Sequence, residues 1–303
     1  MLGGTRFIGK AACTSLVEQG HTVTVLHRGV TPNTVIGVND LLVDRRDPDA
    51  LRLALRGNSY DVVVDMMPMG EADVQIACDA MAETIPRLVA ISSCDVYLAM
   101  DVINKRDSVP IDNRAIDESG ALRTRFFPYR NVASMPASLH DYDKILAENT
   151  YAAHATKHAL SLAILRLPAV YGIGDYQHRV QSILDSMRNT DRISLSPLHA
   201  SFRMSRSYVE NVADAITKVC ASSAVGACNV AEPNAYSEFE WHRMIGTAAG
   251  WQGEIVVDAQ VSDGEDFDGR QHCVLDSSLF RTAYGYTERI STNVALLDIV
   301  RSQ

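Results

Sequence analysis

Short runs of apolar and β-branched residues alternate with longer segments of helical periodicity along the first half of the chain. The short runs predict strands at residues 21–26, 41–43, 61–65, 87–92 and 161–166. The longer segments predict helices at residues 7–19, 47–55, 71–84 and 139–157. Strands and helices that alternate at this spacing are typical of a parallel sheet covered on both faces. We therefore expect an α/β fold with a doubly wound parallel sheet.

The pattern becomes irregular between residues 100 and 138, where Arg, Asp, Asn and Pro are frequent. We interpret this stretch as a long loop of the kind that often forms a substrate lid. Helical periodicity returns at residues 177–188, 210–220 and 237–249, and the last third of the chain has less regular order. These features predict a first domain over residues 1–170 and a smaller C-terminal lobe over residues 171–303.

Composition narrows the class of protein. The chain has 303 residues, of which 47% are hydrophobic and 21% charged, as in globular proteins. The net charge of −9 argues against nucleic acid as a partner, and no apolar run approaches the roughly 20 residues of a membrane helix. Six scattered cysteines favour reduced thiols in a cytoplasmic protein. No metal site is expected, because metal-ligand spacing is absent among His178, His199, His242 and His272.

The strongest local signal for chemistry is a glycine-rich turn at the start of the chain. A turn of this kind that enters a helix brings backbone N–H groups close to a pyrophosphate, and the positive helix end favours its charge. The alternative is a tight turn without a ligand. If a dinucleotide binds here, the binding residues are Gly3, Thr5, Arg6, Phe7, Ile8 and Gly9.

Several further motifs follow in order: ISSCDVY at 91–97, RLPAVYGIGD at 166–175, RSYV at 206–209, NVADA at 211–215 and the segment 276–286. Together with GGTRFIG at 3–9, the chain resembles the extended and atypical short-chain dehydrogenases/reductases, the NAD-dependent epimerase/dehydratase group. The resemblance implies a Rossmann-like NAD(P)-binding domain followed by a lobe that mainly binds substrate. It also implies hydride transfer on a nucleotide sugar or a similar polar carbonyl or alcohol compound, and homodimers are common in that group.

Two features at the glycine turn depart from the family pattern. The family's central first strand precedes the turn, whereas only Met1 and Leu2 stand there. Loss of that strand would remove pairing from both neighbouring strands, so we expect a misassigned start or a shortened chain rather than a natural loss. Arg6 replaces the second glycine of the family motif. Its side chain either reaches a phosphate or covers the turn in solvent.

The resemblance also implies a catalytic group of Ser or Thr with a Tyr-x-x-x-Lys pair on one helix face. Ser93 aligns with the family's Ser or Thr, and Lys144 is the candidate lysine. His140 stands four residues before Lys144, and Tyr142 only two. Three interpretations remain open: Tyr142 acts from an irregular helix start, His140 replaces the tyrosine, or Tyr129 acts from the loop. A fourth is a site that binds cofactor without this acid/base chemistry.

Cofactor choice depends on the ends of the second and third strands of the resembled fold. NAD enzymes usually place an acid after the second strand, but this chain has His27-Arg28-Gly29. A guanidinium there can bind the 2′-phosphate of NADP, so NADP is preferred over NAD. The alternative is an exposed turn arginine. Asp44 resembles the family residue at the adenine, and Arg45 and Arg46 are either solvated or add to phosphate binding.

Two rival functions and one further site remain. The displaced tyrosine favours a catalytically impaired NAD(P)-binding sensor or scaffold. Some atypical relatives associate with RNA, although the acidic charge counts against that activity here. A set of arginines forms a candidate site for a diphosphate or another anionic substrate, with solvent exposure as the alternative: Arg114, Arg123, Arg125, Arg130, Arg203 and Arg206.

Overall fold

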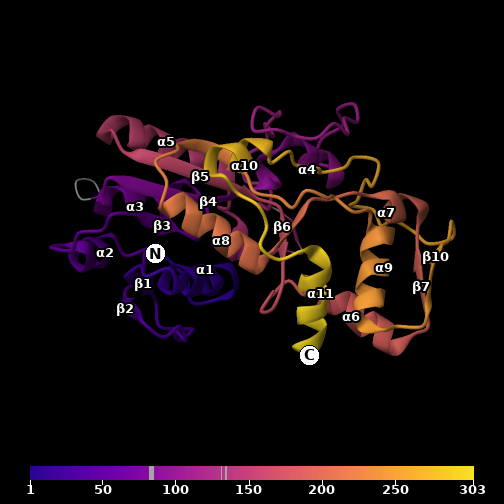
Figure 1. The fold of residues 1–303 in the computed structure, drawn as a ribbon. Helices are drawn as coiled ribbons and strands as arrows, with labels where there is room; N and C mark the ends of the chain where they lie inside the picture. Colours follow the sequence, from indigo (N-terminus) through magenta and orange to yellow (C-terminus); the bar gives the residue numbers. More distant parts are fainter. Residues whose placement is uncertain (82–84, 131, 134) are drawn as a thin grey trace.

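A computed structural model describes residues 1–81, 85–130, 132–133 and 135–303, and parallel strands form its framework (Figure 1). β1 pairs with β2, and β3, β4, β5 and β9 pair in that order, every pair being parallel. The strands are β1 (Val23–His27), β2 (Val38–Leu42), β3 (Val63–Asp65), β4 (Arg87–Ser93), β5 (Ser161–Leu167) and β9 (Gly226–Asn229). The predicted strands 41–43 and 21–26 are thus each displaced by one to three residues.

Met1 to Gly3 lie between β1 and β3, where the family's first strand was expected. Leu2 forms parallel bridges to Leu26 on one side and to Asp65 on the other. Its N–H donates to the Val64 carbonyl at 2.8 Å, and its own carbonyl accepts from Met66 at 3.1 Å. One buried residue therefore joins the two groups of strands at the level where the glycine turn begins.

Helices cover both faces of the sheet. On one face, Val89 and Ile91 of β4 share a core with α1 (Phe7–Glu18) and α8 (Val209–Cys220). On the other, Leu88 and Ala90 pack with α3 (Glu71–Met81), α5 (Lys144–His158) and α2 (Pro48–Leu55). This alternation along one strand follows from the two-residue period of a strand. The predicted doubly wound parallel sheet is confirmed; residues 82–84 of the predicted helix 71–84 lie outside the described residues.

Short parallel strand pairs and helices build the C-terminal lobe (Figure 1). The strands pair as β6 with β8 and as β7 with β10. They are β6 (Ala169–Tyr171), β7 (Arg192–Leu195), β8 (Arg206–Tyr208) and β10 (Glu254–Val257). The helices of this part are α6 (Gln181–Asn189), α7 (Pro197–Ser201), α9 (Glu238–Ala249), α10 (Ser278–Tyr284) and α11 (Thr292–Arg301).

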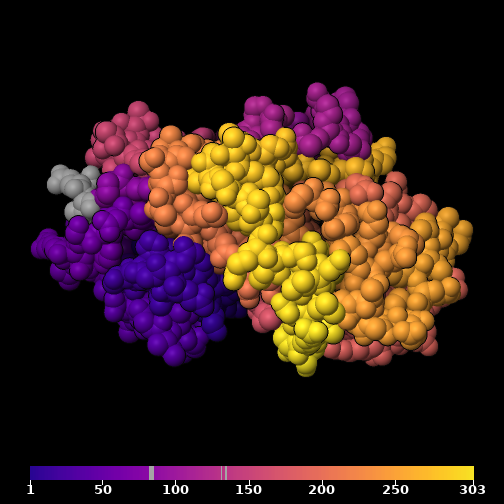
Figure 2. All heavy atoms as spheres, in the orientation of Figure 1, coloured from indigo at the N-terminus to yellow at the C-terminus, as the bar shows by residue number. Residues whose placement is uncertain are grey.

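The chain beyond residue 170 contributes to both parts of the molecule. β9 extends the main sheet, and Ser15 of α1 bonds to Asp214 and Thr217 of α8. Figure 2 shows the indigo N-terminal segment next to orange and yellow segments from the last third of the chain. A domain boundary near residue 170 stays a prediction.

Helix α6 begins four residues later than predicted from the periodicity. The Asp175 carboxylate accepts hydrogen bonds from the N–H groups of Gln177 and Arg179, and His178 has a φ of 55°. A side chain that captures the backbone N–H groups in this way competes with the helix. The segment 175–180 is therefore a turn, and the helix starts at Gln181.

Residues 112–116 of the stretch 100–138 bond to the C-terminal part. α4 (Leu98–Ile103) covers its start, and η2 (Ala137–Leu139) covers its end. Ile116 donates to the Val274 carbonyl at 2.7 Å, and Asp112 donates its N–H to Gln271 at 3.0 Å. The role of a lid stays a prediction. Over the described part of the chain, no helix is both long and apolar enough to cross a bilayer.

Candidate functional site

The glycine turn leads directly into helix α1. Gly3 and Gly4 have φ values of 80° and 138°, which favour glycine. A Cβ atom on Gly9 would lie 2.5 Å from the Gly4 Cα, closer than a side chain can approach. The first turn of α1 therefore packs directly on the backbone of the turn, as the dinucleotide-binding interpretation requires of this glycine.

The side chains of the turn contact the loop after β6. The Arg6 guanidinium lies 5.6 Å from the centre of the Tyr176 ring, and the Phe7 ring packs edge-on against the same tyrosine. Arg6 is exposed, while Thr5 and Ile8 are partly buried. Arg6 thus lies over the turn on an aromatic support, and its contact with a phosphate stays a prediction.

The two predicted cofactor residues at the neighbouring strand ends are exposed. Arg28 directly follows β1, and Leu26 of that strand bridges to Leu2, so Arg28 lies beside the start of the glycine turn. Asp44 follows β2, and its carboxylate accepts the N–H of Arg46 at 3.0 Å. Both side chains lie at the carboxyl ends of parallel strands, where ligands of such sheets bind.

Arg45 has a different role from either one expected. Its guanidinium forms two hydrogen bonds, at 2.6 and 2.7 Å, to Asp65 at the end of β3. The buried Asp65 also accepts the Tyr151 hydroxyl at 2.5 Å. Burial, the largest single effect, opposes ionisation, but the charge of Arg45 and the hydrogen bonds from Arg45, Tyr151 and the Met67 N–H together outweigh it and lower the pKa of Asp65. Arg45 is a structural cation, and Arg46 pairs with Asp73.

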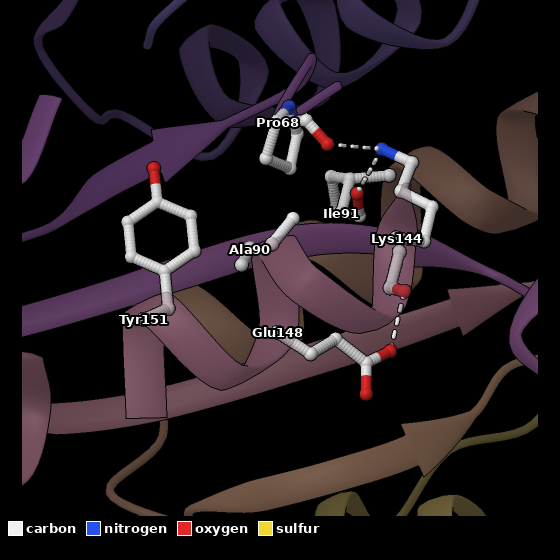
Figure 3. Close-up of a pocket in the computed structure, with 8 residues that line it drawn as sticks. Pro68, Ala90, Ile91, Lys144, Glu148 and Tyr151 are labelled. Carbon is white, nitrogen blue, oxygen red and sulfur yellow. Dashed lines mark hydrogen bonds between the residues drawn. The ribbon is translucent and has the colours of Figure 1, made fainter. Parts of the chain in front are cut away.

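Lys144 is buried above the carboxyl ends of β3 and β4. Its Nζ donates to the carbonyls of Pro68 at 2.9 Å and Ile91 at 3.0 Å (Figure 3). Burial lowers the pKa of Lys144 to about 8. An ammonium group has three donors, so one remains beyond these two bonds.

Glu148 lies one helical turn after Lys144, and both residues line one small pocket (Figure 3). It accepts the Ser92 hydroxyl at 2.5 Å and forms a buried ion pair with Arg166 at 2.7 Å. Arg166 also donates to Tyr97, whose hydroxyl donates to Asn229. This chain of bonds joins α5, β4, β5 and β9, which is a structural role.

The predicted helix 139–157 is wrong at its start. Asp143 is the N-cap of α5, because its carboxylate accepts the N–H groups of Ile145 and Leu146. The same buried carboxylate pairs with Arg123, which ties the start of the helix to the stretch 100–138. Tyr142 and His140 therefore stand outside the helix. The interpretation in which Tyr142 acts requires an irregular helix start, and the structure has one. Because Tyr142 precedes the helix, its position relative to Lys144 does not follow the geometry of a regular helix.

Ser93, Tyr142 and Lys144 converge at the carboxyl end of β4. Lys144 binds the carbonyl two residues before Ser93, and its Nζ lies 5.9 Å from the centre of the Tyr142 ring. The Ser93 hydroxyl accepts the N–H of Asp95 at 3.1 Å. Tyr129 packs on Tyr142 with ring centres 5.1 Å apart. Geometry thus brings these side chains into one neighbourhood, while their catalytic roles stay predictions.

Asp95 has no role assigned by the sequence motifs. It lies in the short turn η1 (Cys94–Val96) and is only 4% exposed. Burial raises its pKa to about 6. The sequence signal that could have identified Asp95 as a site residue is its position two residues after Ser93, at which strand β4 ends.

The arginines proposed as an anion site are mostly paired within the protein. Arg114 pairs with Asp112, Arg130 with Asp141 and Arg203 with Glu240. The buried Arg123 and Arg206 pair with Asp143 and Glu238. Five of the six guanidinium groups thus have carboxylate partners, and a site for an anionic substrate stays a prediction. Among the residues that the structure describes, no three acids, histidines or thiols form a metal-binding group.

A sequence profile of the NAD dependent epimerase/dehydratase family matches residues 1–231. The chain belongs to this family. The predicted family is therefore confirmed, and with it the class of NAD-dependent enzymes of the short-chain dehydrogenase/reductase type. The match includes the glycine turn, β4 and α5, which carry the site described above.

Two curated proteins are similar to this chain over part of their length. One is the 2-alkyl-3-oxoalkanoate reductase of Stenotrophomonas maltophilia, 29% identical over 190 residues, 58% of this chain and 51% of the relative. The other is the chloroplast stem-loop binding protein of 41 kDa b of Arabidopsis thaliana, 29% identical over 129 residues, 38% of this chain and 34% of the relative. The matches thus span about half or less of these relatives.

Solved structures show the same fold over almost the whole chain. The UDP-glucose 4-epimerase of Thermotoga maritima, solved with UDP-glucose, has a TM-score of 0.75 at 14% identity, covering 99% of this chain and 96% of the epimerase. The dTDP-glucose 4,6-dehydratase of Bacillus anthracis, solved with NAD, has a TM-score of 0.73 at 15% identity, covering 99% and 94%. At this identity the likeness establishes the fold.

Proposed function

We propose that the protein is an NAD(P)-dependent epimerase, dehydratase or reductase that transfers a hydride to or from a polar carbonyl or alcohol substrate. The observation that carries this proposal is the glycine turn, where the missing Gly9 side chain lets helix α1 approach the backbone of Gly4. The positive end of a helix of 12 residues then faces the turn. Residues and geometry both fit a pyrophosphate.

NADP is the preferred cofactor in this proposal. Arg28 is exposed beside the glycine turn, and no acid follows β1 to bind the ribose hydroxyls. A guanidinium binds a phosphate bidentately, and the 2′-phosphate is the group that distinguishes NADP from NAD. Asp44 at the adjacent strand end would meet the adenine.

Each catalytic side chain has a separate task. The dinucleotide supplies or accepts the hydride when it is bound. Ser93 polarises the reacting oxygen, and Tyr142 moves the proton. Lys144 keeps two ammonium donors on Pro68 and Ile91, which fixes the loop after β3 against β4, and offers the third donor to a ribose hydroxyl.

The compounds in the names of the similar proteins support the proposed substrate class. UDP-glucose and dTDP-glucose carry alcohols next to a diphosphate, and a 2-alkyl-3-oxoalkanoate carries a ketone. All three offer a carbon that exchanges a hydride. A nucleotide sugar or a similar polar carbonyl or alcohol compound is the proposed substrate.

Turnover of such compounds tests the proposal. Purified protein with NADPH or NADP⁺ is incubated with a panel of nucleotide sugars and 3-oxo acids, and absorbance at 340 nm and product chromatography are followed. Tyr142→Phe lowers kcat by about 10²–10⁴-fold with cofactor affinity almost unchanged. Near-normal turnover in that variant would remove Tyr142 from the mechanism and direct the search to His140 or Tyr129. Cofactor binding without turnover on the whole panel would favour the sensor.

One observation favours a second candidate, an RNA-binding protein: a relative at 29% identity over 129 residues is named a stem-loop binding protein. The net charge of −9 counts against it. Retention of a labelled RNA hairpin on the protein, lost as salt increases, would support this candidate. Retention at no salt concentration would exclude it for that RNA.

A further inference from the structure

The ring of Tyr142 has a neighbour that the proposed function does not use. Tyr142 precedes the N-cap Asp143, and its N–H donates to the Leu139 carbonyl at 3.1 Å, outside the hydrogen bonds of α5. Its ring lies 5.1 Å, centre to centre, from the ring of Tyr129, and the two planes are tilted by 47°. Aromatic pairs at this separation attract each other beyond the area that they bury. A phenol that the helix does not hold is thus held by a second ring.

Hydrogen bonds on both sides of Tyr129 fasten it to the segment that carries Tyr142. Two residues before Tyr129, the Phe127 N–H donates to the Asp143 carboxylate at 2.7 Å. One residue after it, the Arg130 guanidinium donates to the Asp141 carboxylate, also at 2.7 Å. The two acceptors are the residues directly after and directly before Tyr142. The bonds therefore bring the two tyrosines face to face from two separate parts of the chain.

The segment that carries Tyr142 rests on the loop after β3. The Asp143 N–H donates to the Met69 carbonyl at 2.8 Å. A Cβ atom on Gly70 would lie 2.3 Å from the Asp141 carbonyl oxygen, closer than a side chain can approach. This glycine therefore allows the main chain at Asp141 to lie directly on the loop, and the base of the tyrosine pair is fixed.

A cation lies near each ring of the pair. The Arg106 guanidinium is 5.0 Å from the centre of the Tyr129 ring, and the Lys144 Nζ is 5.9 Å from the centre of the Tyr142 ring. Both distances are within the range of cation–π attraction. Arg106 is itself held at the end of α4, where its N–H donates to the Asp101 carbonyl at 2.7 Å. These contacts favour one arrangement of the two rings.

We propose that Tyr129 is a positioning residue whose ring holds the Tyr142 phenol in the orientation for proton transfer, which rests on the proposed function. Misplacement of a reacting group by about 1 Å lowers a rate by up to about 10²-fold. The support comes from the ring, so the Tyr129 hydroxyl takes no part in the chemistry. This distinguishes the proposal from the interpretation in which Tyr129 itself moves the proton.

Nuclear magnetic resonance tests the contact without any substrate. The tyrosine rings are labelled with ¹³C, and the Tyr142 signals are identified by their loss in Tyr142→Phe. Because the Tyr129 ring current acts on these signals, Tyr129→Leu should shift them, whereas Tyr129→Phe keeps a ring and should leave them nearly in place. Unchanged signals of the remaining tyrosines show that each variant is folded. Tyr142 signals that Tyr129→Leu does not shift would overturn the proposal.

The matched control is Tyr60→Leu, which removes another partly buried tyrosine ring, three residues before the amino end of β3. The site lies at the carboxyl ends of the strands, so this change should leave the Tyr142 signals and kcat as in the wild type. An equal shift of the Tyr142 signals in Tyr60→Leu and Tyr129→Leu would contradict a specific contact between Tyr129 and Tyr142.

Kinetics test the positioning role. Tyr129→Leu lowers the kcat of substrate oxidation about tenfold or more, while KM changes by less than about threefold. Tyr129→Phe keeps the ring and has a kcat within about threefold of the wild type. Equal losses of kcat in the two variants would assign the proton transfer to the Tyr129 hydroxyl and overturn the proposal. A loss confined to KM would make Tyr129 a substrate contact, which also overturns it.

A double variant shows through which group Tyr129 acts. In Tyr142→Phe the phenol hydroxyl is absent, so adding Tyr129→Leu should lower kcat by no more than about twofold further. Equal fold losses from Tyr129→Leu in the two backgrounds would show that Tyr129 acts independently of Tyr142, against the proposal. Absence of any dinucleotide-linked turnover in the wild type would reject the proposed function itself. Turnover in the wild type with unchanged kcat in Tyr129→Leu would reject the positioning role alone.

Discussion

At the scale of single residues, Arg28 is the side chain that we propose to select NADP over NAD. Its side chain is exposed directly after β1. Arg28→Ala is expected to weaken NADP binding about tenfold or more and to leave NAD binding nearly unchanged, because NADP alone carries the 2′-phosphate. Calorimetric titration with each dinucleotide measures both constants.

The matched control for Arg28 is Arg56→Ala, which removes another exposed arginine at the end of α2. It should leave both dissociation constants within a factor of two. Equal losses for NADP and NAD in Arg28→Ala, or tighter binding of NAD by the wild type, would contradict the assignment.

Lys144 couples the site to pH. Its pKa is about 8 in the folded protein, against an ordinary value of 10.5. Between these values the unfolded chain binds the proton and the folded chain does not, so stability rises with pH. The free energy of unfolding of the wild type relative to Lys144→Met should therefore increase from pH 8 to pH 10, by up to about 1.4 kcal/mol per unit.

Urea unfolding of both proteins at several pH values measures this difference, and groups common to the two chains cancel. A difference that stays constant or falls between pH 8 and pH 10 would show that Lys144 titrates near its ordinary value. In that case the buried position would not lower the pKa of its ammonium group.

At the scale of elements, the start of α5 forms the site. Asp143 caps the helix and neutralises the buried Arg123, and its carboxylate also accepts the N–H of Phe127 at 2.7 Å. Asp143→Ala is expected to lower the free energy of unfolding by about 3–5 kcal/mol, because it leaves a buried guanidinium unpaired. Chemical denaturation measures this loss.

Asp141→Ala is the control for the cap, two residues away. Asp141 is exposed and pairs with the exposed Arg130, so its loss should cost less than about 1 kcal/mol. If the two variants lost equal stability, the cap and the buried pair would not hold this segment.

The helices show which element boundaries the sequence could predict and which it could not. Apolar periodicity correctly predicted α1, α2, α8 and α9, whose ends carry local signals such as the Asp47 and Ser237 caps. It placed the start of α5 too early, at residue 139 instead of Lys144. The helix begins at Lys144 because Asp143 caps it, a local signal that the periodicity passed over, whereas the pair of Asp143 with Arg123, 20 residues earlier, needed the tertiary structure.

The candidate site was predictable to a similar degree. Gly9 and Ser93 stand where the motifs put them, because a turn and a strand end are local features. The partners of Arg45 and the unsatisfied carboxylate of Asp95 depend on burial among distant segments. Those contacts needed the tertiary structure.

At the scale of the whole molecule, the start of the chain and the segment 209–229 meet on the sheet. Leu2 bridges β1 and β3, while β9 and α8 return from the C-terminal part to the sheet and to α1. The sequence predicted the doubly wound sheet of the first part, but it placed residues 171–303 mainly in the C-terminal lobe, so the return of α8 and β9 to the sheet was not predicted. Contacts between the stretch 100–138 and the segment 270–276 were not predictable, since they join irregular chain.

The central claim is that a dinucleotide binds at the glycine turn. Calorimetric titration of the wild type, Gly9→Ala and Gly246→Ala with NADP⁺ tests it most directly. Gly9→Ala adds a Cβ that would meet the Gly4 backbone, whereas the Cβ of Gly246→Ala, in α9, meets only the side chains of Trp251 and Met187. We predict micromolar binding to the wild type and to Gly246→Ala, and at least a tenfold loss in folded Gly9→Ala. Unchanged affinity in folded Gly9→Ala, or no binding of either dinucleotide to the wild type, would contradict the account.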